Sequence, residues 1–307
     1  MNDPYLIEGP ALISFSGGRT SGYMLKMILD AHGGILPDGV HVCFANTGKE
    51  REETLRFVHE CETRWSVRVH WLEWVPPPPR RKKGEPKRDF IADNACRFNG
   101  VGYYSAARNG EPFAELIRRK QYLPNSQMRY CTIELKIRIM IAFMRAQGFR
   151  KWTNVIGLRA DEMMRVFKAI ERTKGGKEPY SIAIPMATQA GGMVRQRDVQ
   201  TFWKAQPFDL GIHSADGNCD LCFLKARQSR ARRIRQDPSS ADWWIEQELA
   251  AKHSMKAHSE RNARFHADES VAGLRRAVMS QSMLDLGTPE DNEFDAECGL
   301  WCAGEAA

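Results

Sequence analysis

The sequence lacks any run that approaches the roughly 20 apolar residues needed by a membrane-spanning helix. Its first residues, MNDPYLIEG, place an acid where a secretory signal carries basic residues ahead of an apolar stretch. We therefore expect a cytoplasmic protein with no membrane anchor.

Extremes of composition are also absent. The 307 residues are 42% apolar and 27% charged, which excludes disordered and collagen-like chains. A chain of this length builds an apolar core without disulfide bonds. The eight cysteines are therefore expected to be thiols, metal ligands or catalytic groups.

The formal net charge is +7, and much of the surplus lies in two tracts. One is RRKK at residues 80–83, followed by Lys87 and Arg88, and the other is RQSRARRIRQ at residues 227–236. Such tracts either form a solvated face or attract phosphates of a nucleotide, a nucleic acid or a carrier protein's acidic surface. The first tract lies in a proline-rich segment, residues 76–88, which predicts a mobile basic loop.

Apolar runs at residues 11–15, 40–45, 67–74, 152–158 and 182–185 predict five strands. Helical patterns lie between them, notably after residue 18 and at residues 50–65, 111–120 and 133–147. This alternation predicts a Rossmann-like, doubly wound parallel α/β sheet with helices on both faces and ligands beyond the carboxyl ends of the strands. We expect that domain to cover residues 1–225, and residues 226–307 to form a helical appendage with a cysteine-containing tail.

The segment SGGRTS, residues 16–21, follows the first strand and opens a helix. Gly17 and Gly18 allow the backbone to approach an anion, and the hydroxyls of Ser16, Thr20 and Ser21 can donate to phosphate oxygens. An ordinary capped glycine turn is the alternative. The segment is not a Walker loop, which requires G-x-x-x-x-G-K-[ST].

The pattern Ser-Gly-Gly-x-x-Ser resembles the pyrophosphate loop (PP-loop) of the ATP pyrophosphatase superfamily. Further motifs follow in order: Asn46-Thr47-Gly48, Arg129-Tyr130-Cys131, Gly157-Leu158-Arg159-Ala160-Asp161-Glu162 with Arg165, and Glu297-Cys298-Gly299-Leu300 near the end. Together they resemble a divergent bacterial or phage member of the phosphoadenosine phosphosulfate reductase family. The resemblance implies that ATP or phosphoadenosine phosphosulfate binds at Ser16, Gly17, Gly18, Thr20, Ser21, Asn46, Thr47, Gly48, Gly157, Arg159, Asp161 and Arg165.

Cationic residues near predicted strand ends or helix starts could clamp a sulfate or phosphate group. They are Lys136, Arg159 and Arg165, with surface salt bridges as the alternative role. Asp161 and Glu162 could orient a ribose or hold Mg²⁺, or they could simply complement a helix dipole.

Cys219 and Cys222 form a C-x-x-C turn, and Cys131 lies at a predicted helix start. Such thiols bind zinc or an iron–sulfur cluster, or form a redox pair. Resemblance to the related adenylylsulfate reductases implies a 4Fe–4S cluster on Cys131, Cys219 and Cys222, although residue 132 is Thr where those enzymes carry a second adjacent cysteine. The fourth ligand would be Cys96, Cys298 or Cys302, or one iron would stay open. Cys43 and Cys61 are expected in the core.

Two enzymatic hypotheses follow. In a reductase, Cys298 attacks the sulfonyl sulfur with Lys136 and Arg159 as catalytic cations, and Cys302 or a thioredoxin-like protein resolves the adduct. In an ATP pyrophosphatase, ATP adenylates a nucleic-acid or small-molecule acceptor for sulfur insertion from a sulfide donor, and the basic tracts hold nucleic acid. A non-catalytic nucleotide or iron–sulfur sensor is the third hypothesis, and a homodimer is left open.

Overall fold

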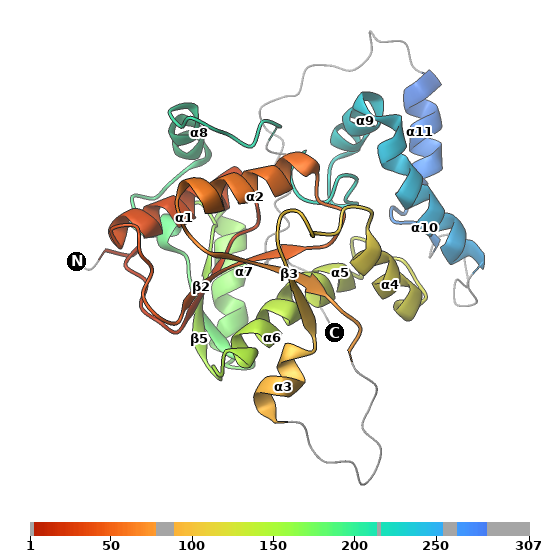
Figure 1. Cartoon of the computed structure of the whole chain (residues 1–307). Coiled ribbons are helices and arrows are strands. Elements are labelled where there is room, and N and C mark those ends of the chain that lie inside the picture. The colour runs from red at the N-terminus through yellow and green to blue at the C-terminus, as the bar shows by residue number, and fades with distance from the viewer. Residues whose placement is uncertain (1–2, 78–88, 214–215, 254–262, 281–307) are drawn as a thin grey trace.

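The computed structural model describes residues 3–77, 89–213, 216–253 and 263–280. Its centre is a six-stranded sheet with helices on both sides (Figure 1). The strands are β1 (Ala11–Ser14), β2 (Val40–Asn46), β3 (Val69–Trp74), β4 (Phe98–Val101), β5 (Trp152–Ile156) and β6 (Tyr180–Ala183). Their order across the sheet is β4-β3-β2-β1-β5-β6.

The sheet confirms the predicted Rossmann-like fold class and corrects it in one respect. Five strands run parallel, and β1 lies in the middle between β2 and β5. The sixth, β4, pairs antiparallel with β3 and was not predicted. Its sequence FNGV is short and contains Asn99 and Gly100, so it shows no alternating pattern. Pairing with the β3 edge, rather than strand propensity, makes it a strand.

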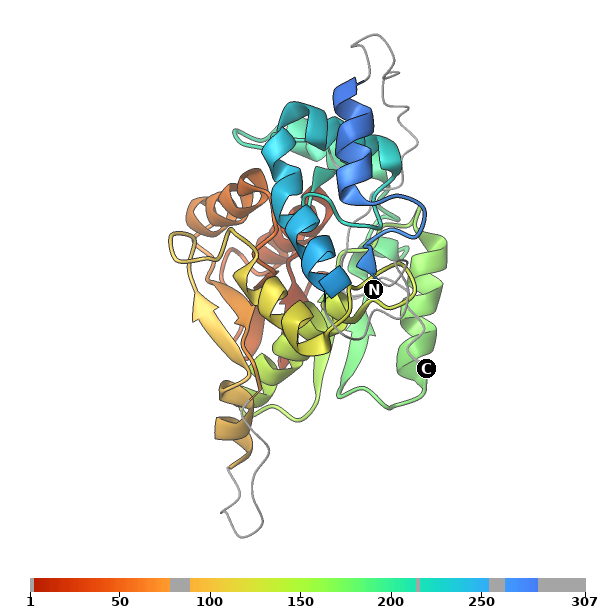
Figure 2. The ribbon, with the colours of Figure 1, turned by 90° about the vertical axis from the view of Figure 1, so that its right-hand side faces the viewer.

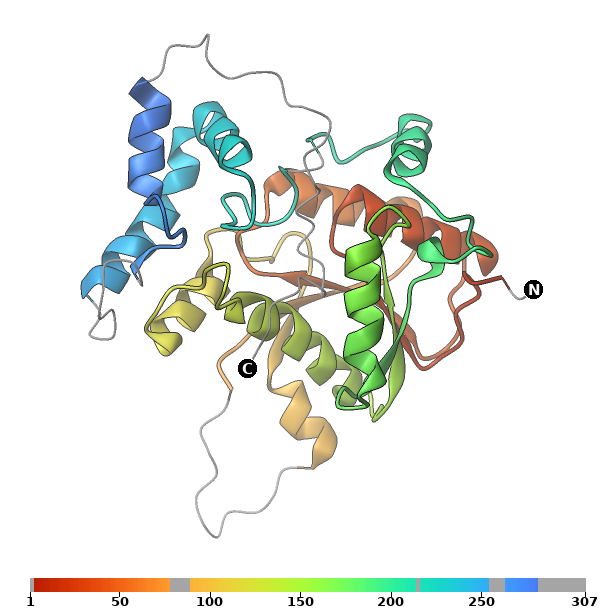
Figure 3. The same cartoon turned by 180° about the vertical axis from the view of Figure 1, so that it is seen from behind.

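Alternate strand residues point to opposite faces, and both faces are apolar. On one face, Ile13, Val42 and Trp71 pack under α1 (Arg19–Ala31), α2 (Glu52–Arg64) and α8 (Gln196–Lys204). On the other face, Leu12 and Cys43 belong to a second buried cluster. The helices α6 (Ile139–Ala146) and α7 (Met163–Lys174) cover this face, as the view from behind in Figure 3 shows. Burial on both sides explains why the parallel strands read as continuous apolar runs.

Further helical elements lie in the connections between strands, and two 3-10 turns follow the last strand, β6. The segment before β4 forms α3 (Phe90–Ala95), and the predicted helix at residues 111–120 is α4 (Glu111–Lys120). The predicted helix at 133–147 has two parts, because a π-helical turn, Ile133–Arg138, follows the short α5 (Tyr130–Thr132) and leads into α6. Single 3-10 turns occupy Pro185–Ala187 and Pro238–Ala241.

Three helices after residue 226 gather at one end of the molecule, beyond the sheet (Figures 1 and 2). They are α9 (Arg227–Gln236), α10 (Asp242–His253) and α11 (Val271–Ser280). The buried Glu248 carboxylate of α10 accepts hydrogen bonds from the backbone N–H of Phe265 and Val271 at 3.2 and 2.9 Å. Trp244 is buried in the same cluster that contains α6, so it packs in the core. The boundary near residue 225 stays a prediction.

The second basic tract forms α9, and most of its arginines make contacts within the molecule. Arg232 pairs with Asp216 at 3.0 Å, Arg227 with Glu269 at 2.9 Å and Arg233 with Asp237 at 2.9 Å. Arg230 is buried, and Arg235 donates to the Val278 carbonyl at 3.3 Å. This tract therefore holds the appendage together. The whole of the first tract, residues 80–88, lies outside the described residues.

None of the helices within the described ranges is both long and apolar enough to cross a bilayer.

A half-buried histidine pair, His41 and His70, makes stability depend on pH. Burial lowers the pKa of His70 to about 4, with a smaller contribution from His41. The folded chain therefore excludes a proton that the unfolded chain binds between about pH 6.5 and 4, and the free energy of unfolding falls as the pH falls through this window. Over this pH range, we expect the free energy of unfolding of His70→Asn to fall by about 2 kcal/mol less than that of the wild type. This figure is smaller than the full pKa difference gives, because the ring is partly exposed and solvent screens its charge. Urea denaturation at pH 7 and pH 4.5 measures it. An unchanged pH dependence in the variant would contradict the assignment.

Candidate nucleotide site

The loop between β1 and α1 requires glycine at its second position. Gly17 has φ +80°, and a Cβ atom there would lie 2.7 Å from Cγ2 of Thr54 and 3.1 Å from the Phe44 ring. The chain at Gly17 is thus pressed against α2 and β2. Gly18 is different, because its φ of −101° and ψ of 165° are extended values that any residue adopts. No side chain caps α1, which starts directly after Gly18.

Hydroxyl groups close the loop around this helix start. Ser21 Oγ donates to the Gly18 carbonyl at 3.0 Å and lies 2.9 Å from Ser16 Oγ. The backbone N–H of Ser16 donates to Ser21 Oγ at 3.2 Å. A Cβ atom on Gly157 would lie 3.2 Å from Ser21 Cα, so the segment after β5 also passes close to the loop. The predicted loop residues and Gly157 are therefore brought together at the carboxyl ends of the two central strands.

Arg159 connects the β5 end to the loop. Its Nη1 donates to Thr20 Oγ1 at 3.0 Å, and its Nε donates to Asp161 Oδ1 at 3.0 Å. The guanidinium is buried, with the side chain 6% exposed. Burial alone would raise the pKa of Asp161, but the hydrogen bond from the Gln196 N–H and the charge of Arg159 outweigh it and leave that pKa below its ordinary value. Arg165 pairs with Glu162 in the same turn.

Glu50 is a buried carboxylate that sequence reasoning did not single out. Its Oε2 accepts from both the N–H and Oγ1 of Thr47 at 2.8 Å, and its Oε1 lies 3.7 Å from Lys136 Nζ. The Glu50 side chain is 1% exposed. An acid directly after the β2 end motif was the available signal. Lys136, a predicted site residue, therefore faces Glu50, which follows the end of β2 and lies 86 positions earlier in the chain.

The Asn46 side chain hydrogen-bonds the end of β2 to β3 and to the segment at Ala107. Its Nδ2 donates to Glu73 Oε1 of β3 at 2.6 Å and to the Ala107 carbonyl at 2.9 Å. Its Oδ1 accepts from the Gly48 N–H at 3.1 Å. Burial raises the pKa of Glu73, against the opposing effect of the hydrogen bonds from Ala107 and Asn46. Asn46 therefore shapes the strand ends rather than projecting toward solvent.

The cysteines of the C-x-x-C turn are both buried. Cys219 Sγ lies 3.4 Å from Thr47 Oγ1 and 4.0 Å from Glu50 Oε1. Burial, and then the Glu50 charge, raise the pKa of Cys219. Cys131 is partly buried at the start of α5, and Cys43 and Cys61 lie in the core as predicted.

Within the part of the chain that the structure describes, no three His, Cys, Asp or Glu side chains are placed to share a metal ion. The structure therefore does not show a shared cluster on Cys131, Cys219 and Cys222, and the cluster stays a prediction. Cys298 and Cys302, the predicted nucleophile and its resolving thiol, lie outside the described residues.

The sequence profile of the phosphoadenosine phosphosulfate reductase domain matches residues 10–164, half of the chain. The chain belongs to this family. The matched range begins at β1 and ends at the start of α7, so it contains the PP-loop, Glu50, Lys136 and Arg159.

One relative is the uncharacterized nin region protein ORF290 of Escherichia phage lambda. It is 29% identical over 223 residues, which are 71% of this chain and 67% of the phage protein. No solved structure matches this chain. The similarity to a phage protein is consistent with the divergent membership inferred from the motifs.

Substitutions at the buried Glu50 test its role through the free energy of unfolding. Glu50→Ala removes the acceptor of both Thr47 bonds and the carboxylate facing Lys136, so we expect it to lower the free energy of unfolding by about 3 kcal/mol. Glu50→Gln keeps an acceptor oxygen and is the matched variant, expected to cost about 1 kcal/mol. Urea denaturation measures both. Equal, small losses for the two variants would show that Glu50 does not organise the strand ends.

Proposed function

We propose that this protein is an enzyme that binds an adenine nucleotide at the PP-loop and carries out sulfur chemistry on it, as a phosphoadenosine phosphosulfate reductase-like oxidoreductase. The observation that carries the proposal is the contact of Arg159 with Thr20 at the uncapped start of α1. Phosphate binds well where a helix N-terminus, hydroxyl donors and a buried guanidinium lie together.

The nucleotide's phosphates would lie over Gly18 and the loop hydroxyls. Arg159 offers a planar fork to a phosphate or sulfate oxygen and is held in place by Asp161. Asn46, Thr47 and Gly48 end the neighbouring strand and would line the adjoining side of the site. Because Asp161 already holds Arg159 and the Gln196 N–H, we assign it a positioning role ahead of the ribose or Mg²⁺ roles considered from sequence.

In the reductase reaction, the Cys298 thiolate attacks the sulfur of the sulfonate group. The new S–S bond forms as the bond from that sulfur to the bridging phosphate oxygen breaks, and phosphoadenosine phosphate leaves with the electron pair. A second thiol, from Cys302 or a thioredoxin-like donor, then attacks Sγ of Cys298, releasing sulfite and forming a disulfide. The thiols are oxidised and the sulfur is reduced.

Cationic side chains would stabilise the charges in this step. The tail that carries Cys298 also carries Glu297 and other acids, so the thiolate needs positive neighbours supplied by the domain. Lys136 and Arg159 are buried cations at the strand ends and are the residues we assign to this role. The predicted iron–sulfur cluster has no part in these steps, and a homodimer is not needed for them.

The second candidate is the ATP pyrophosphatase reaction. An acceptor oxygen attacks the α-phosphorus of ATP, pyrophosphate leaves, and a sulfide donor then displaces AMP. One observation favours this candidate: a cavity beside α6 contains Arg145 and Lys177, which make no ion pair with the residues that the structure describes, and this suits a nucleic-acid acceptor. Turnover of either kind separates both candidates from a non-catalytic sensor, and release of pyrophosphate separates the second from the first.

The loop assignment is tested with Gly18→Val. Valine adopts the dihedral angles of Gly18, but the residue is buried, so thermal unfolding first verifies that the variant folds; its side chain then blocks the approach of phosphate. We expect affinity for ATP and for phosphoadenosine phosphosulfate to fall at least ~10-fold in calorimetric titrations. Gly17→Ala is the contrasting variant, because its positive φ and its contact with Thr54 predict a loss of stability as well. Undiminished affinity of folded Gly18→Val for both nucleotides would refute the assignment.

The reductase step is tested at Cys298. Wild-type protein mixed with phosphoadenosine phosphosulfate and no reductant should gain the mass of one sulfonate on Cys298, as seen by intact and peptide mass spectrometry. Cys298→Ser should form no adduct, and Cys96→Ser, which removes an exposed thiol, is the control that should keep it. Absence of the adduct, together with release of pyrophosphate from ATP by Cys298→Ser at the wild-type rate, would replace the reductase reaction with the ATP-dependent one.

A further inference from the structure

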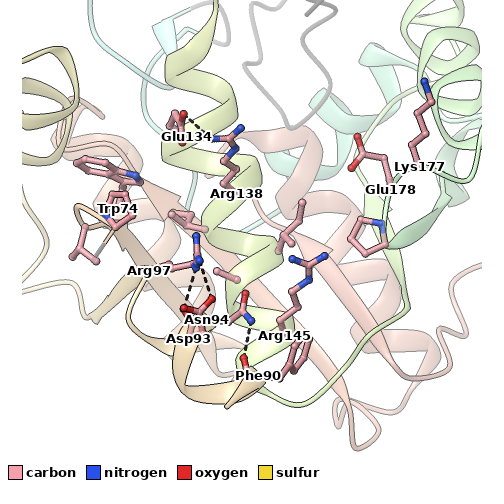
Figure 4. A pocket seen from close by; sticks show the side chains of 16 residues that line it. Trp74, Phe90, Asp93, Asn94, Arg97, Glu134, Arg138, Arg145, Lys177 and Glu178 are labelled. Atoms are coloured by element: carbon pink, nitrogen blue, oxygen red, sulfur yellow. Dashed lines mark hydrogen bonds and ion pairs between the residues drawn. The ribbon is translucent and has the colours of Figure 1, made fainter. Parts of the chain in front are cut away.

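A cavity of about 560 Å³ lies between α3, α6 and the turn before β6, and it contains none of the PP-loop residues (Figure 4). This volume is within the range of small-ligand sites. Its walls combine apolar and charged side chains. The lining residues used below are Phe90, Ile139, Arg145, Lys177 and Pro179, with the carboxylates Asp93, Glu134 and Glu178.

Each carboxylate of the lining is already paired. Asp93 binds Arg97 at 2.8 Å, and Glu178 binds Arg172 at 3.2 Å. Glu134 accepts from both Lys120 and Arg138 at 2.8 Å. The negative charges of the cavity are therefore neutralised by neighbouring cations.

Arg145 and Lys177 remain available. Neither makes an ion pair with any residue in the ranges 3–77, 89–213, 216–253 and 263–280. They come from separate elements, Arg145 from the last turn of α6 and Lys177 from the turn before β6, and Figure 4 shows both on the same side of the cavity. Two cations fixed on different elements provide a site for more than one anionic oxygen.

Apolar side chains lie beside these cations. Phe90, Ile139 and Pro179 line the same cavity, so its ligand has an apolar or aromatic body as well as negative charge. A nucleotide unit within a strand has both, with a base that packs on apolar surfaces and phosphates that attract Arg and Lys.

We propose that this cavity binds single-stranded nucleic acid, with phosphates at Arg145 and Lys177 and a base against the Phe90 and Pro179 wall. The net charge of +7 favours such a partner. The α9 tract is a weaker candidate because its arginines hold the appendage together.

The cavity is also connected to the nucleotide site. Glu134 and Arg138 line it, and Lys136 of the same π-helical turn faces Glu50 at the strand ends. A bound strand would thus lie close to the turn whose Lys136 faces Glu50. Its role as acceptor for the ATP-dependent reaction rests on the proposed function, whereas the binding itself does not.

The test uses the full-length protein and a fluorescein-labelled, mixed-sequence single-stranded DNA 12-mer in anisotropy titrations. Arg145→Ala/Lys177→Ala should weaken binding at least ~10-fold and reduce the slope of log affinity against log salt by about 1.4, since each phosphate contact contributes about 0.7. The matched control, Arg118→Ala/Lys252→Ala, removes the same charge outside the cavity and should change affinity less than ~2-fold. Thermal unfolding verifies that both variants fold.

Calorimetric titration of ATP separates this inference from the proposed function. The cavity variant should bind ATP like wild type, and Gly18→Val should retain the 12-mer while losing ATP. Equal weakening by the two double variants would overturn the cavity site, as would no binding of the 12-mer by wild type. Displacement of the 12-mer by an acidic peptide at lower concentration than by unlabelled DNA would also overturn it, in favour of a protein ligand. Binding of AMP but not the 12-mer to the cavity would assign it to free nucleotides and refute the proposal.

Discussion

The close approach of Gly17 to α2 and β2 is the constraint on which the site depends. No other residue type accepts its positive φ together with the contacts to Thr54 and Phe44. Because the chain turns sharply there, α1 starts directly beyond the end of the central strand, and Ser16 and Ser21 come within hydrogen-bonding distance. The first backbone N–H groups of α1 and their partial positive charge therefore lie at the carboxyl edge of the sheet.

Charge at this edge of the sheet is organised in two groups, one at the ends of β1 and β5 and one at the end of β2. Arg159, Asp161 and Thr20 form one group, and Glu50, Lys136 and Thr47 form the other. Isolated charges are costly to bury, and each member here has an opposite charge or a hydroxyl beside it. Buried cations already held in place need little reorganisation when they receive a phosphate or sulfate, which is the property that nucleotide chemistry at this edge requires.

The π-helical turn before α6 gives one helix two functions. A turn of this kind is wider than an α-helical turn and is frequent at functional sites. Lys136 faces the strand ends, whereas Glu134 and Arg138 line the cavity on the other side. If the two sites are used together, this turn contributes residues to both.

The sequence by itself determined the strand, loop and helix at residues 11–31, the parallel fold class and the family, because alternation, adjacent glycines and motif order are local properties of the chain. It missed β4, whose strand character comes from the β3 edge, and it did not single out Glu50. Only the tertiary structure decided that Arg159 reaches Thr20, that α9 uses its arginines internally and that Arg145 and Lys177 face one cavity. These contacts join segments far apart in the chain, and which side chains meet there depends on how the strand ends and helices pack rather than on any local pattern.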